Sequence, residues 1–218
     1  GKTVDVKDLS ARDIWYAWVT VPRIDDAGQS VLFRDELNQA RELGYAVAMT
    51  EWNWNGWWAS NWRTRSGESI RERIPLDSLL AKGIGAAGML HAIMRQGDVV
   101  QLGAQSMLIG DRWGIHAICC DRDGRIPPYM VPSGQVTMLY SWYHGRKRLK
   151  VELAGVPRYD QPYRMAGNIP ARGAAFLDVL ATRNDETLYV HAINRHFNES
   201  LTVQIDISAL AQQPGRQG

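Results

Sequence analysis

Two stretches of the chain repeat one order, in which a helix precedes a short apolar strand. Residues 28–43 carry apolar side chains at near-helical spacing with charges between them, and Gly44 is a typical helix stop. Residues 45–50, YAVAMT, form an apolar run of the kind that fills a strand buried on both faces. Residues 76–96 and 98–104 repeat the pattern. This alternation predicts parallel α/β units.

Three glycines interrupt the second predicted helix, at Gly83, Gly85 and Gly88. A glycine inside a helix costs about 1 kcal/mol relative to alanine. We therefore expect these positions to allow the close approach of a neighbouring element.

The carboxyl end of the first predicted strand carries the strongest functional signal. Glu51 follows the apolar run and is followed by Trp52, Asn53 and Trp54. In an α/β barrel, active groups lie where strands end and loops begin. Tryptophan surface desolvates a carboxylate, and an amide can hydrogen-bond a hydroxyl group. Glu51 is the candidate catalytic residue, and the alternative is a strand-end carboxylate in a salt bridge.

Five of the nine tryptophans lie between residues 52 and 62. Flat apolar faces beside hydrogen-bonding side chains suit a sugar, whose C–H face stacks while its hydroxyls find polar partners. A hydrophobic wedge at the mouth of a barrel is the alternative. A nucleic-acid base is disfavoured because no basic stripe accompanies the rings. The interleaved polar residues are Asn53, Asn55, Ser60, Asn61 and Arg63.

The pattern changes beyond about residue 115, where prolines and glycines separate short segments of apolar alternation. Residues 135–144 predict either a short helix or a strand. The alternating segments predict an antiparallel β-sandwich and are residues 148–153, 174–181, 187–193 and 201–207. The predicted fold is thus α/β plus all-β, with one domain over residues 1–114 and a second over residues 115–218.

Charge, cysteines and histidines exclude several classes of partner and cofactor. The 25 basic and 23 acidic residues give a net charge of +2, which favours neither nucleic acid nor an anionic membrane. Cys119 and Cys120 are adjacent, so neither a disulfide framework nor metal-ligand spacing is present. We expect His91 and His116 to be structural, and no cofactor or metal. No membrane-length apolar segment or signal-peptide pattern occurs, which favours the cytoplasm, with secretion as the alternative.

The segment VAMTEWNW resembles a motif of the family 51 glycoside hydrolases, the α-L-arabinofuranosidases. The similarity extends over AAGMLHAIMRQGDVVQLGAQSML, RWGIHAI and PPYMVPSGQVTMLYSWYHG, and so over essentially the whole chain. It implies the C-terminal half of such an enzyme, with the last strands and helices of a (β/α)8 barrel followed by a jelly-roll-like β-sandwich. The chain also starts on Gly1 in what resembles mid-domain sequence, so we expect a fragment or a processed piece.

The resemblance also implies roles for individual residues. Glu51 would be the nucleophile of a retaining double displacement, and Trp52, Asn53 and Trp54 would line the sugar pocket. Gln105 is a further candidate substrate contact. The acid/base carboxyl of the family lies in a Gly-Asn-Glu segment that this chain lacks, and we read Glu199 as a turn residue instead.

The missing carboxyl implies a partner, an N-terminal polypeptide that completes the barrel and covers apolar strand surface. The expected activity is release of terminal α-L-arabinofuranosyl residues from arabinose-containing polysaccharides or oligosaccharides. The alternatives are a non-catalytic carbohydrate-binding fragment and a related barrel glycosidase that acts on β-glucan. We also expect a homo-oligomer.

Overall fold

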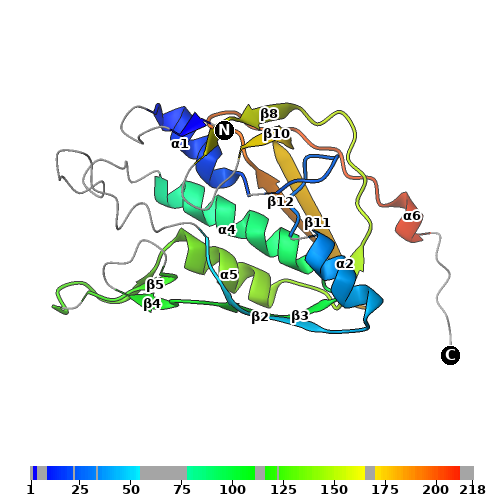
Figure 1. The fold of residues 1–218 in the computed structure, drawn as a ribbon, viewed down its shortest axis with the longest axis horizontal. Helices are drawn as coiled ribbons and strands as arrows, with labels where there is room; N and C mark the ends of the chain where they lie inside the picture. Colours follow the sequence, from blue (N-terminus) through cyan, green and yellow to red (C-terminus); the bar gives the residue numbers. More distant parts are fainter. Residues whose placement is uncertain are drawn as a thin grey trace.

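Two long helices lie between strands on either side (Figure 1). The helices are α4 (Ser78–Met94) and α5 (Pro132–Trp142), which pack against each other. On one side lies the strand pair β2 (Val47–Trp52) and β3 (Val100–Gln105), and on the other the hairpin β11 (Leu177–Arg183) and β12 (Leu188–Asn194). The computed structural model describes residues 2–3, 9–21, 23–32, 34–54, 78–110, 116–121, 123–164 and 170–211.

The predicted parallel α/β unit is confirmed. α2 (Arg34–Glu42) leads into β2, α4 follows, and β3 pairs with β2 in parallel. β2 lies two residues later than predicted, so Glu51 lies inside the strand. The helix predicted from residue 28 begins at Arg34 instead, because residues 24–30 form a turn closed by an antiparallel bridge.

Asp25 and Ser30 show why that helix begins late. Asp25 Oδ1 accepts hydrogen bonds from the backbone N–H groups of Ala27 and Gln29, both at 2.9 Å. Ser30 pairs with Ile24 as an isolated bridge and donates its N–H to Asp178 Oδ2 at 2.9 Å. Side chains of this kind offer the backbone an alternative to helical hydrogen bonds.

The prediction that both strands are buried on both faces is wrong for the described residues. Val47 and Met49 pack into a cluster with the helices, whereas Ala48 and Thr50 are exposed. On β3, the Leu102 side chain is 51% exposed. Among the described residues, the helices therefore cover one face of the sheet, and the opposite face carries exposed side chains. The cluster contains Leu32, Leu37, Trp52, Ala92, Ile93, Val99 and Val100.

The glycines of α4 lie at close contacts, as predicted. A Cβ atom at Gly83 would lie 2.7 Å from Pro132 Cβ on α5. A Cβ at Gly85 would overlap the Trp54 indole and the backbone carbonyl of Trp18. Trp18 lies in the last turn of α1 (Ala11–Val19). These glycines let α4 pack against α5 on one side and against α1 on another.

The second half of the chain matches the predicted strands only in part. Residues 135–142 are helical, within α5, so the helical alternative holds for most of residues 135–144, and β11 and β12 pair in antiparallel orientation. Residues 201–207 form no strand, so that prediction is wrong: Val203, Ile205 and Ile207 are exposed. They precede a short helix, α6 (Ser208–Ala211).

Several short strands complete the structure. β7 (Lys147–Leu149) joins the other edge of β11, and β8 (Arg158–Gln161) pairs with β10 (Ala171–Ala175). β8 was not predicted. A β-sandwich and a domain boundary after residue 114 stay predictions. α4, which precedes residue 114, contacts α5, β11 and β12, which follow it in the sequence. The remaining strands are β1 (Lys2–Thr3), β4 (Ile109–Gly110), β5 (Ile118–Cys119), β6 (Tyr129–Met130) and β9 (Tyr163–Arg164).

Candidate functional site

Glu51 lies near the carboxyl end of β2 and is exposed. Trp52, the next residue, is buried against α4. Thr50 and Glu51 are both exposed, so the alternation of side chains set by Val47 and Met49 is broken before Trp52. The β2–β3 pairing is irregular between Met49 and Trp52, and such bulges re-aim side chains near functional sites.

The two neighbouring tryptophans are part of the core. Trp52 is 4% exposed and packs against residues of α4, and Trp54 is 3% exposed. The Trp54 indole Nε1–H donates a hydrogen bond to the backbone carbonyl of Trp18 at 2.8 Å. Both rings therefore anchor the end of β2 to the helices. Their predicted role in lining a sugar pocket stays a prediction, and Trp57, Trp58 and Trp62 lie outside the described residues.

Asn53 ties the ends of the two parallel strands together. Its Nδ2 donates to the backbone carbonyl of Ser106 at 2.7 Å, and its Oδ1 accepts from the N–H of Trp54 at 2.8 Å. The Ser106 N–H in turn donates to the carbonyl of Trp52 at 2.9 Å. Both ends of the Asn53 amide are thus used to fix the backbone that follows Glu51.

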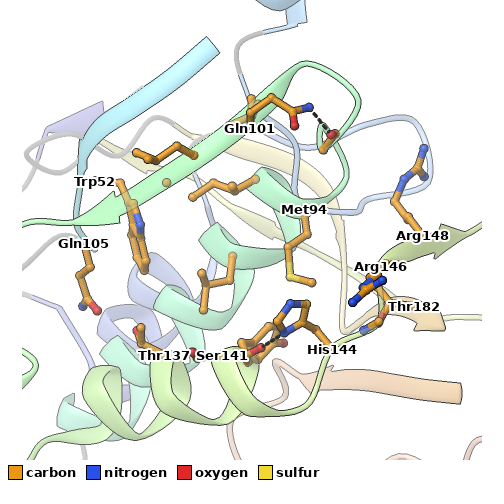
Figure 2. Close-up of a pocket in the computed structure, with 18 of the residues that line it drawn as sticks. Trp52, Met94, Gln101, Gln105, Thr137, Ser141, His144, Arg146, Arg148 and Thr182 are labelled. Carbon is orange, nitrogen blue, oxygen red and sulfur yellow. Dashed lines mark hydrogen bonds between the residues drawn. The ribbon is translucent and has the colours of Figure 1, made fainter. Parts of the chain in front are cut away.

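Gln105 lines a cavity of about 720 Å³ between β3, α4 and α5 (Figure 2). Trp52 reaches into the same space from β2, but Glu51 is not among the lining residues. Both Nε2 and Oε1 of Gln105 are buried, and neither has a hydrogen-bond partner among the described residues. The structure thus brings Trp52 and Gln105 together on the helix side of the sheet, in a cavity that Glu51 does not line.

The walls of this cavity differ in character. Leu90, Ile93 and Met94 of α4 form its apolar floor. The α5 side is more polar, and Arg146 and Arg148 lie at one end. The lining residues of α5 are Thr137, Tyr140 and Ser141, and His144, which follows the helix, also lines the cavity.

A buried charge cluster that was not predicted from the sequence lies behind the cavity. Asp178 of β11 is fully buried and forms ion pairs with Arg195 and Arg95. It also accepts a hydrogen bond from the Ser30 hydroxyl at 2.6 Å. Burial alone would raise the pKa of Asp178, but the charge of Arg195 and the hydrogen bond from His91 outweigh burial and hold the pKa well below its ordinary value.

His91 connects this cluster to the cavity wall. Its Nδ1 lies 2.8 Å from Asp178 Oδ1, and its Nε2 lies 2.6 Å from the Tyr140 hydroxyl. Burial lowers the pKa of His91 and raises that of Tyr140. The neutral imidazole thus donates from Nδ1 to the carboxylate and accepts from Tyr140. The prediction that His91 is a hydrogen-bonded structural residue is confirmed.

A signal for this cluster was present in the sequence. Asp178 interrupts the apolar segment AAFLDVLA, and a charge in such a segment is buried only when it is paired. No group of three or more His, Cys, Asp or Glu side chains that could hold a metal occurs in the part of the chain that the structure describes. A search of the same residues finds no helix with the length and apolarity of a membrane span.

Comparisons with known proteins agree with the resemblance seen in the sequence. No protein-family model matches the chain, and no curated protein matches it significantly. Among solved structures, the chain is similar to the thermostable GH51 α-L-arabinofuranosidase from Thermotoga petrophila RKU-1, with 24% identity and a TM-score of 0.50. It is also similar to an α-L-arabinofuranosidase from Thermotoga maritima solved with arabinose, with 22% identity and a TM-score of 0.51.

These matches cover 73% and 79% of this chain, but only 31% and 36% of the two solved structures. The chain therefore spans about a third of the length of the arabinofuranosidases that it matches. At this level of identity, the similarity establishes a shared mixed α/β fold.

Proposed function

We propose that this chain supplies the nucleophile of a retaining glycoside hydrolase that releases terminal α-L-arabinofuranosyl groups from arabinose-containing polysaccharides or oligosaccharides. The observation that supports this most is the position of Glu51. It is an exposed carboxylate at the carboxyl end of a parallel strand, in a fold shared with arabinofuranosidases.

In this mechanism, the Glu51 carboxylate attacks the anomeric carbon and a second carboxyl group protonates the departing oxygen. A covalent arabinosyl-enzyme forms through an oxocarbenium-like transition state, and water then releases the sugar with retention of configuration. Attack needs a nucleophile held in a fixed position. The Asn53–Ser106 hydrogen bond and the buried Trp52 and Trp54 rings hold the backbone on the carboxyl side of Glu51.

The acid/base carboxyl, which stands roughly 5 Å from the nucleophile in retaining enzymes, would come from an N-terminal polypeptide that completes the barrel. Glu199 does not fit that role. It follows β12 in a turn in which its N–H donates to His196 Nδ1 at 2.9 Å, and its carboxylate lies 3.4 Å from His196 Nε2.

The test is hydrolysis of an aryl α-L-arabinofuranoside by the chain assembled with its N-terminal polypeptide. Glu51→Gln should lower kcat by several powers of ten and leave substrate affinity within a few-fold, because the amide keeps the shape but cannot act as the nucleophile. Glu199→Gln is the matched control and should retain full activity.

Three outcomes would contradict the proposal. Sugar binding without any turnover would indicate a carbohydrate-binding fragment. Hydrolysis of β-glucan in preference to arabinofuranosides would indicate a different barrel glycosidase. Unchanged activity in Glu51→Gln would exclude Glu51 as the nucleophile.

A further inference from the structure

Tyr140 of α5 lies between two buried histidines that come from other elements. Its hydroxyl group lies 2.6 Å from Nε2 of His91 on α4. Its ring stacks on the imidazole of His191 on β12, with ring centroids 4.2 Å apart and an interplanar angle of 23°. The two imidazoles also lie near each other, with centroids 6.4 Å apart. Tyr140 thus joins α5 to α4 and to β12 at one place, which we call the Tyr140 contact.

The hydrogen bond to His91 requires a neutral imidazole. His91 Nδ1 lies 2.8 Å from Asp178 Oδ1, and a carboxylate can only accept, so Nδ1 carries the imidazole proton and Nε2 accepts from Tyr140. A proton added at Nε2 would place two donors against each other. Asp178 also forms ion pairs with Arg95 and Arg195, so a charged His91 would be the third cation around one carboxylate.

His191 is held in a second environment that favours the neutral form. Its side chain is 7% exposed, and its Nε2 atom is buried with no hydrogen-bond partner among the described residues. Burial lowers the pKa of His191 and outweighs a hydrogen bond to the backbone of Tyr143, which raises it, and a charge on His144 lowers the pKa further. A proton at Nε2 would be a buried donor without an acceptor, which is unfavourable.

The rest of the Tyr140 contact is apolar. Tyr140 packs with Ala87 of α4 and Ile193 of β12 in one buried cluster. The titratable and charged groups around the two imidazoles come from α4, α5, β11 and the segments that follow α5 and β12. They are Arg95, Tyr140, Asp178, His144 and Arg195. Asp178 is the one acid among these groups and is already paired, so protons on both histidines would lack compensation.

The last turn of α5 depends on this contact for its burial. Of residues 135–142, Tyr140 alone is buried, and the neighbouring Leu139 and Trp142 are exposed. Tyr140 and Ser141 also line the cavity, and Figure 2 shows Ser141 on the helix that forms its polar wall. Release of Tyr140 would therefore free the last turn of α5 and widen the cavity.

We propose that the Tyr140 contact is a proton-sensitive switch, which holds the last turn of α5 when His91 and His191 are neutral and releases it when both become charged. Movement of this turn exposes both Nε2 atoms to water, where each can bind a proton without a buried, unpaired donor. Opening is thereby linked to the uptake of two protons. The inference does not depend on the proposed glycosidase activity.

Linkage between proton binding and opening sets the direction of the effect. Burial lowers the pKa of both imidazoles in the closed form, so below about pH 6.5 the open form binds protons that the closed form does not. The closed form is therefore fully favoured above that pH, and the equilibrium constant for opening rises as the pH falls. Two protons per opening correspond to a rise of up to about a hundredfold per pH unit, and one proton to about tenfold.

Hydrogen exchange, measured by mass spectrometry on the protein encoded by its complete gene, tests this linkage. Exchange rates are collected between about pH 7.5 and pH 5 and divided by the intrinsic rate at each pH, which gives the opening constant of each segment. For amides in residues 139–143, this constant should rise by a factor that approaches about a hundred per pH unit below about pH 6.5. Amides in residues 80–86 of α4 should change much less.

Two variants remove one proton site each and keep the packing. His191→Phe retains a ring against Tyr140 but cannot bind a proton. His91→Gln retains a donor for Asp178 and an acceptor for Tyr140. Each variant should reduce the rise in the opening constant to at most about tenfold per pH unit, and the double variant should abolish it. If the double variant does not fold, the two single variants still decide the question.

His144→Gln is the matched control. His144 is exposed, and its Nδ1 atom lies 3.0 Å from the backbone carbonyl of Tyr140, so it lies beside the contact without being enclosed by it. This variant should keep the steep dependence of the unmodified protein. Thermal unfolding at about pH 7.5, where both buried histidines are neutral, should show that every variant used is folded.

Each other pattern overturns the inference. An opening constant of residues 139–143 that does not change with pH excludes a proton-linked contact. A rise of only about tenfold per pH unit in the unmodified protein excludes the uptake of two protons. An unchanged dependence in either single variant assigns the protons to other groups, and an equal loss of protection in α4 indicates global unfolding. Because activity is not measured, failure of the proposed function leaves this test unaffected.

Discussion

Asp178 Oδ1 and His91 Nδ1 lie 2.8 Å apart, and both side chains are completely buried. The two residues come from β11 and from α4, which pack against each other. Tyr140 extends the contact to α5, so one series of hydrogen bonds connects a strand with two helices. These hydrogen bonds join the part of the protein that carries Glu51 to the C-terminal strands.

We expect Asp178→Asn to destabilise the chain strongly. The substitution leaves the fully buried guanidinium of Arg195 without its carboxylate, and breaking a buried pair in this way costs about 3–5 kcal/mol. Asp98→Asn is the control, since Asp98 and Arg41 form an exposed pair worth about 0–1 kcal/mol. Urea unfolding of both variants gives the two free energies, and equal losses would contradict this account of the cluster.

Stability should fall as the pH is lowered, first through His91. Burial lowers the pKa of folded His91, so below about pH 6.5 the unfolded state binds a proton that the folded state does not. Unfolding free energy therefore decreases by up to about 1.4 kcal/mol per pH unit in that window. Replacing His91 by Gln should flatten this slope, whereas His144→Gln, at an exposed position, should not.

Asp178 should add a second loss of stability in more acidic solution. Its folded pKa lies well below the ordinary value, so its contribution is complete above the unfolded carboxyl pKa of about 4 and is lost as the pH falls below that value. Thermal unfolding between about pH 5 and pH 2 measures this step. A melting temperature that stays constant over that range would contradict it.

Gly85→Ala should lower stability although alanine favours a helix. The added Cβ would overlap the Trp54 ring and the Trp18 carbonyl, and overpacking of this kind costs about 1–3 kcal/mol. Gly88→Ala is the matched variant in the same helix. Its Cβ would lie 3.1 Å from Cγ1 at the end of the Val21 side chain, which is a milder contact than the overlap at Gly85. Calorimetry should rank Gly85→Ala as the more destabilising of the two.

Asn53→Ala should reduce catalysis in the assembled enzyme by loosening the backbone after Glu51. The substitution removes one hydrogen bond to Ser106 and one to Trp54, each worth about 1 kcal/mol. As a positioning residue, Asn53 should affect kcat more than KM. A rise in KM alone would indicate a direct sugar contact instead.

Local patterns predicted α2, α4 and the parallel pair of β2 and β3, because the spacing of their apolar residues reflects the period of each element. They did not predict α1. Burial was harder to predict, because it depends on which elements cover a strand. β2 and β3 have the apolar composition of strands covered on both sides, yet helices cover only one side among the described residues.

The environment of the candidate site also depends on contacts distant in sequence. Glu51 is exposed whereas the adjacent Trp52 is buried, and Trp54 binds the backbone of Trp18, which lies in α1. Neither relation appears in the short motif that marks these residues. The Asp178 cluster joins residues separated by up to 165 positions, so only the isolated charge within an apolar segment indicated it.

The most direct test of the central claim is to trap the covalent intermediate. The assembled enzyme is treated with a 2-fluoro-substituted α-L-arabinofuranosyl substrate, quenched in acid, digested and analysed by mass spectrometry. We predict one fluoropentosyl adduct, on the peptide that contains Glu51 and on its carboxylate. Release of arabinose with the adduct on a different carboxylate would contradict the assignment of Glu51 as the nucleophile.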